Sequence, residues 1–188
     1  MLPIMSDIVL TPGKKAWTAC SLFAAMLAFG ALAMKPSWPG VLPILIFYVL
    51  LIINTYFSVK LFAEVIPDLP SQRAIDAILV VFYGVMAFSI GNAALFGFFL
   101  AVFFTIATMK YVLVLGIVSQ PRLLKRKITA DCLGILLGLA VVGGIMAGHE
   151  TFSVWGLAII FSVANVCMFF VWPLYRLDSF RSNPYTGN

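Results

Sequence analysis

Charged residues are scarce in this sequence. They make up 10% of its 188 residues, whereas 63% are hydrophobic. Soluble domains usually carry about 25% charged residues, and a chain this short could not bury so much apolar surface in water. The composition therefore excludes a soluble globular protein. It predicts an all-α integral membrane bundle that forms a single transmembrane domain over residues 1–188.

Residues suited to metals, haem or disulfides are also few. Histidine occurs once, as His149, and the three cysteines (Cys20, Cys132, Cys167) lie far apart within apolar segments. This pattern excludes a bis-histidine haem, a histidine-rich metal site and a disulfide framework. The sequence also lacks the motifs of serine hydrolases, zinc proteases, P-loops and dinucleotide sites. We expect no cofactor and no metal, and no catalytic residue can be named.

Six apolar stretches are long enough to cross a bilayer, which takes about 20 helical residues. The stretch from 74 to 118 is more than twice as long as one crossing requires, so it must fold back. Gly91 and Asn92 are the expected turn, because both tolerate a left-handed backbone. The first stretch also resembles a signal peptide, but we interpret it as a retained helix. The predicted spans are residues 17–34, 41–63, 74–90, 93–116, 129–147 and 152–175.

The basic residues predict the orientation. With six spans, most of them fall in loops on one side, and only Lys35 lies on the other. The positive-inside rule then places both termini in the cytoplasm, most simply of a cell (inner) membrane. Tryptophans are expected near the span ends, where the membrane meets water. No basic surface of the kind that binds nucleic acid is present. The residues used are Lys14, Lys15, Arg73, Arg122, Lys125, Arg126, Lys127, Arg176 and Arg181, with Trp17, Trp38, Trp155 and Trp172.

Five ionisable residues near the cytoplasmic boundary are candidates for function, because charges within membrane spans are costly and often functional. They are Lys60, Glu64, Asp76, Lys110 and Asp131, on four different predicted helices. One interpretation is a charged vestibule in which Lys110 pairs with Asp76 or Asp131 beside an ion or solute path.

A simpler interpretation of these residues is open as well. Lys60 and Lys110 would extend their side chains to the interface, and Asp76 and Asp131 would favour the first turns of their helices. Lys110 is the strongest candidate, since apolar residues flank it on both sides. The asparagines Asn54 and Asn165 lie in mid-span and are expected to bond across helices.

Small residues at four-residue spacing predict where helices pack closely, because such spacing lets two backbones approach in lipid. They serve either packing inside one bundle or docking to a second copy or another subunit. The residues are Gly97 and Ala101 on the fourth span, and Gly134, Gly138, Gly144 and Gly148 on the fifth.

Three functions are compatible with this sequence. The first is a small transporter or channel component for an ion or small solute, with Lys110, Asp76 and Asp131 near its pathway. The second is a non-catalytic structural or assembly subunit of a larger membrane complex. The third is a lipid-modifying enzyme, which is disfavoured because no acid–base or metal constellation is present. The expected partners are the lipid bilayer and either further copies of the chain or other membrane subunits.

Overall fold

The computed structural model describes residues 11–34, 38–118, 120–171 and 174, except for the side chains of residues 38 and 39. In this part of the chain there are six α-helices and no strand. All six are long and apolar enough to cross a membrane. The predicted all-α bundle of six spans is therefore confirmed, and the protein is an integral, multi-pass membrane protein. The helices are α1 (Pro12–Met34), α2 (Trp38–Val65), α3 (Pro70–Phe88), α4 (Ala93–Val114), α5 (Pro121–Met146) and α6 (Glu150–Val166), which continues as a π-helical turn over Cys167–Val171.

Several helices begin earlier than the apolar stretches do. α1 starts at Pro12, and α5 starts at Pro121, eight residues before its predicted span. Proline is favoured at a first helical position, because its φ is already helical and its missing N–H has no partner there. The early start of α5 brings basic residues of the expected loop into its first turns. Arg176, Arg181, Lys35, the side chains of Trp38 and Trp172, and the predicted end at 175 lie outside the described residues.

The turn between α3 and α4 lies where the sequence predicts it. Ser89 is the C-cap of α3. Asn92 is the N-cap of α4, where its side chain accepts a hydrogen bond from the N–H of Leu95 at 3.1 Å. An asparagine side chain at this position satisfies one of the unpaired N–H groups of the first turn. The long apolar stretch is thus divided into two antiparallel helices.

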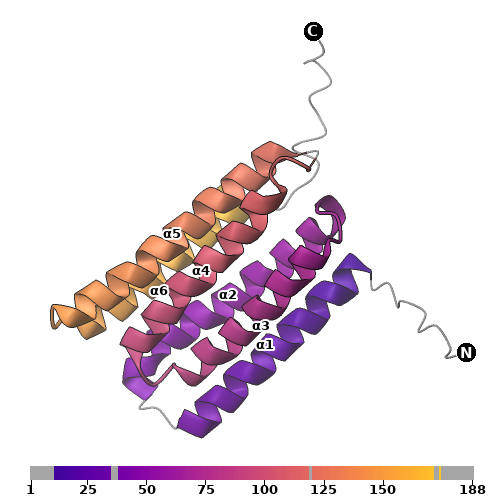
Figure 1. The fold of residues 1–188 in the computed structure, drawn as a ribbon. Coiled ribbons are helices and arrows are strands. Elements are labelled where there is room, and N and C mark those ends of the chain that lie inside the picture. The colour runs from indigo at the N-terminus through magenta and orange to yellow at the C-terminus, as the bar shows by residue number, and fades with distance from the viewer. Residues whose placement is uncertain (1–10, 35–37, 119, 172–173, 175–188) are drawn as a thin grey trace, which may run out of the picture.

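The helices run lengthwise beside one another as a bundle (Figure 1). Their contacts close a ring in the order α1, α2, α6, α5, α4, α3 and back to α1. Each helix packs mainly against the two beside it in this order. At one end of the ring α1, α3 and α5 begin while α2, α4 and α6 end. We call this the basic end, because Lys14, Lys15, Arg122, Lys125 and Arg126 lie there. A ring of six helices leaves a central space that side chains must fill or leave open.

Aromatic side chains fill the half of the ring away from the basic end. Phe47 and Tyr48 of α2 and Phe96 of α4 are fully buried there. The rings of Phe47 and Phe96 lie edge to face with centroids 5.8 Å apart, and Phe47 also contacts Phe161 of α6. Such pairs stabilise beyond the area that they bury. This half of the bundle is therefore a packed core.

The predicted small residues lie mostly between α4 and α5. A Cβ added to Gly138 would stand 2.8 Å from both the nitrogen of Ala101 and the carbonyl oxygen of Gly97, and Gly134 lies against Phe104. Gly144 instead faces Ser153 of α6, and Gly148 turns the chain between α5 and α6 with a φ of 81°. These residues therefore pack or turn within one chain, and we propose no docking surface on them.

Candidate functional site

A cavity of about 500 Å³ occupies the half of the ring near the basic end. Residues of α1 to α5 line it, and the lining includes Lys15 and Asp68, which are exposed at the surface. The cavity therefore opens at the basic end. Its volume falls within the roughly 300–1,000 Å³ range of small-molecule sites.

An ion pair between α3 and α4 lies on one wall of the cavity. The Nζ of Lys110 donates to Oδ1 of Asp76, and both residues line the cavity. The side chain of Lys110 is 16% exposed and that of Asp76 is 40% exposed. Gln72, in the first turn of α3, donates from its Nε2 to the backbone oxygen of Lys110 at 3.3 Å. The pair thus joins two neighbouring helices at the cavity.

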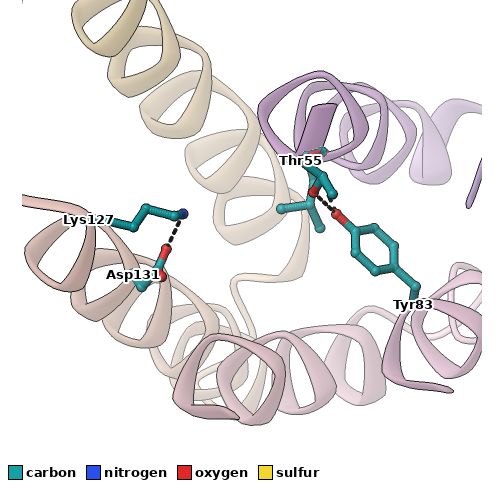
Figure 2. Close-up of polar contacts among 5 residues, drawn as sticks. Thr55, Tyr83, Lys127 and Asp131 are labelled. Atoms are coloured by element: carbon teal, nitrogen blue, oxygen red, sulfur yellow. Dashed lines mark hydrogen bonds and ion pairs between the residues drawn. The ribbon is translucent and has the colours of Figure 1, made fainter. Parts of the chain in front are cut away.

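A second ion pair on α5 is almost completely buried. The Nζ of Lys127 lies 2.6 Å from Oδ1 of Asp131, and these side chains are 7% and 1% exposed. Figure 2 shows the lysine pointing along its own helix to the carboxylate one turn further on. The ammonium of Lys127 also lies 5.8 Å from the centre of the Tyr111 ring, a cation–π distance. Both charges face the cavity.

Two buried acceptor atoms of the lining have no hydrogen-bond partner in the part of the chain that the structure describes. They are Oδ2 of Asp131 and Oε1 of Gln72. Most buried polar atoms in proteins are hydrogen-bonded, and an unpaired one costs about 1–3 kcal/mol. These two oxygens therefore require donors from water or from a molecule that enters the cavity.

Tyr83 of α3 closes the inner end of the cavity. Its hydroxyl donates to the carbonyl of Leu51 at 3.3 Å and accepts from the hydroxyl of Thr55, so α2 and α3 meet through their side chains (Figure 2). The ring of Phe23 from α1 stacks on that of Tyr83 with centroids 3.7 Å apart. At 1.5 Å per residue Tyr83 lies about 20 Å along α3 from Pro70. The cavity thus reaches beyond the middle of the bundle.

The mouth of the cavity carries an exposed ion pair. Arg73 donates to both carboxylate oxygens of Asp68, at 2.9 and 2.7 Å. The hydrogen bonds from Arg73 hold the pKa of Asp68 below its usual value. Both side chains are well exposed, so the pair contributes little to stability.

The structure separates the five predicted charged residues into two groups. Lys110, Asp76 and Asp131 line the cavity, whereas Lys60 and Glu64 are exposed on α2 and are not part of its lining. Their exposure fits the interpretation that Lys60 extends to the interface.

The two asparagines differ in the same way. Asn54 is buried and lines the cavity, whereas Asn165 of α6 is buried elsewhere and donates from its Nδ2 to the carbonyl of Phe161 within its own helix at 2.8 Å. The amide nitrogen of Asn165 therefore bonds within α6 and not, as we had expected, across helices.

Several residues of the site were missed from the sequence, among them Lys127, Gln72 and Tyr83. Lys127 was counted among the basic loop residues, although its spacing of four from Asp131 could have indicated an ion pair on one helix face. Gln72 and Tyr83 carry no comparable sequence signal, since only the neighbouring helices place them at the cavity.

Among the described residues no group of three or more His, Cys, Asp or Glu side chains could hold a metal ion. What the arrangement offers is charge of both signs, hydroxyl and amide groups, and an apolar wall. Comparisons of the chain with protein-family models, with curated proteins and with solved structures found no match.

Proposed function

We propose that this protein is a small-solute transporter whose substrate enters the cavity from the basic end, and that this end faces the cytoplasm. The observation that carries the proposal is the pair of lysine–aspartate contacts inside a cavity that opens to the surface of a membrane bundle. The cytoplasmic placement follows from the positive-inside rule.

The energetics of the charges support a role beyond packing. A buried ion pair is weak evidence for stability, because desolvation offsets most of the attraction between the two charges. Intramembrane charges are costly for the same reason and commonly mark ion or substrate paths. Four charged groups line this cavity, whereas Lys60 and Glu64 lie outside it. The four are Asp76, Lys110, Lys127 and Asp131.

The shape of the central space supports alternating access. Tyr83 and the aromatic core separate the cavity from the opposite end of the ring, and α3 continues only about 8 Å beyond Tyr83. A modest rearrangement of the helices around Tyr83 and Thr55 would open the other side. Transport requires such a second state, because a path open at both ends at once would be a channel.

The test does not need the substrate. Ser58 of α2 is buried, lines the cavity and resembles cysteine in size. We expect Ser58→Cys to react with a membrane-impermeant thiol reagent in both inverted and right-side-out vesicles, as the cavity opens to each side in turn. Cys20 and Cys167 are replaced by alanine in this variant. The native Cys132, exposed on the outer face of α5, is the matched control and should stay unlabelled in the lipid.

Labelling of Ser58→Cys from the basic side alone would contradict transport. It would favour the second candidate, a non-catalytic subunit of a larger membrane complex, with the cavity as a binding pocket only. Native mass spectrometry of the same preparation would then distinguish self-association from other subunits.

A further inference from the structure

The unpaired oxygens of the cavity restrict what the chain can bind. Oδ2 of Asp131 and Oε1 of Gln72 are acceptors, and both residues are more than nine-tenths buried. A solute that displaces water from them must bring N–H or O–H donors, because otherwise the two oxygens lose their only partners. Of the two, the carboxylate of Asp131 makes the stronger bond with a charged donor such as an ammonium.

The charges inside the cavity sum to zero. Among the described lining residues, Lys110 and Lys127 are balanced by Asp76 and Asp131. At the exposed mouth Asp68 is balanced by Arg73, and Lys15 adds a further positive charge there. A solute with a net charge would therefore enter a poorly solvated space that holds no spare counter-charge, which is unfavourable. A solute with both charges but no net charge avoids this cost.

A site for the negative end of such a solute lies on the neighbouring helix, α4. The ammonium of Lys110 has three N–H donors, and its contact with Asp76 accounts for one of them. Lys110 is on α4 against α3, whereas Asp131 is on α5. The two groups thus offer one cationic and one anionic contact from different helices.

One part of the lining is an apolar wall. It includes Leu79 and Val80 of α3, Phe103, Phe104 and Ala107 of α4, and Phe62 of α2. This wall favours a solute with a hydrocarbon side chain, because its burial removes apolar surface from water.

Resting on the proposed transport function, we propose that the substrate is a zwitterion of the amino-acid type with an apolar side chain. Its ammonium group donates one hydrogen bond to Oδ2 of Asp131 and another to Oε1 of Gln72. Its carboxylate accepts from the Nζ of Lys110, and its side chain packs against the apolar wall.

The experiment compares solutes that share one carbon skeleton. Thermal unfolding of the purified full chain in detergent is measured with leucine, with 3-methylbutylamine, which lacks the carboxylate, and with 4-methylpentanoate, which lacks the ammonium. Phenylalanine with phenethylamine and 3-phenylpropanoate forms a second set, and glucose serves as an uncharged donor. We expect a zwitterion to raise the melting temperature and its two truncated relatives to have little effect.

Variants test the named contacts. Asp131→Asn should weaken binding of the zwitterion by about 10- to 100-fold, the loss expected for a hydrogen bond to a charged group. Because this change also removes the carboxylate that Lys127 contacts, a second variant is needed. The double variant Lys127→Met/Asp131→Leu removes both buried charges and should fold while binding equally poorly. Glu64→Gln, outside the cavity, is the control and should bind like the wild type.

The outcomes separate this inference from the proposed function. Equal or better stabilisation by an amine, an acid or glucose would overturn the zwitterion while leaving a solute site in place. Wild-type binding by the double variant would overturn the role of Asp131. If no solute stabilises the protein, the substrate inference fails, and labelling of Ser58→Cys from two sides decides independently whether transport stands.

Discussion

The contact between α4 and α5 yields the sharpest prediction about the fold. Gly138→Ala adds one methyl group at a point where backbone atoms of α4 stand 2.8 Å from its position. Gly143→Ala adds the same group to the same helix, where nothing lies within 4 Å. The two variants thus differ mainly in what the methyl group meets.

The expected magnitude follows from this comparison. Replacing a helical glycine by alanine favours the helix by up to about 1 kcal/mol, and this gain is common to both variants. The atoms facing Gly138 are the nitrogen of Ala101 and the oxygen of Gly97, neither of which can move as a flexible side chain would. Overpacking of this kind costs typically about 1–3 kcal/mol. We therefore expect Gly138→Ala to be less stable than Gly143→Ala by about that amount.

Unfolding of both variants by SDS titration in mixed micelles, followed by tryptophan fluorescence and circular dichroism, measures the difference. Gly143→Ala should match or slightly exceed the wild type in its free energy of unfolding. If the two variants unfold alike, α4 and α5 do not approach as closely as described, and the reasoning is refuted.

Other variants probe the polar groups. Lys127→Met leaves the buried carboxylate of Asp131 unpaired and should lower the free energy of unfolding by about 3–5 kcal/mol. The double variant Lys127→Met/Asp131→Leu should recover most of this loss. Equal instability of the two variants would contradict a buried ion pair. Tyr83→Phe removes the hydrogen bonds of the hydroxyl and should cost about 1–3 kcal/mol in the same unfolding assay; wild-type stability would count against these bonds. Lys110→Met should lower zwitterion uptake into proteoliposomes while assembly is retained, since Asp76 is partly exposed; unchanged uptake would remove Lys110 from the path.

The sequence predicts the helices well for a physical reason. In lipid every backbone polar group must be satisfied within the structure, so an apolar stretch of sufficient length has few alternatives to a helix. The Gly91–Asn92 turn follows from the same constraint, since a stretch twice the bilayer thickness must reverse. The helix starts at Pro12 and Pro121 were missed because apolarity marks where a helix meets lipid, not where it begins.

The arrangement of the helices could not be predicted in this way. The spacing of Gly134 and Gly138 indicates that another helix packs closely against α5. It does not identify that helix, because the other spans present similarly apolar faces and the neighbours of α5 depend on how all six helices pack. For the same reason the sequence predicts that Lys110 pairs with Asp76 or with Asp131 but does not distinguish between the two. The site itself depends on this ring, because it brings residues from five helices to one cavity.

Cysteine labelling along α3 tests the central claim most directly. Leu79 lines the cavity, whereas Met86, about two helical turns further on, is fully buried in the aromatic core. With a water-soluble thiol reagent applied from the basic side, we predict that Leu79→Cys reacts readily and Met86→Cys does not. Protection of both positions would contradict a cavity that reaches from the basic end into the middle of the bundle.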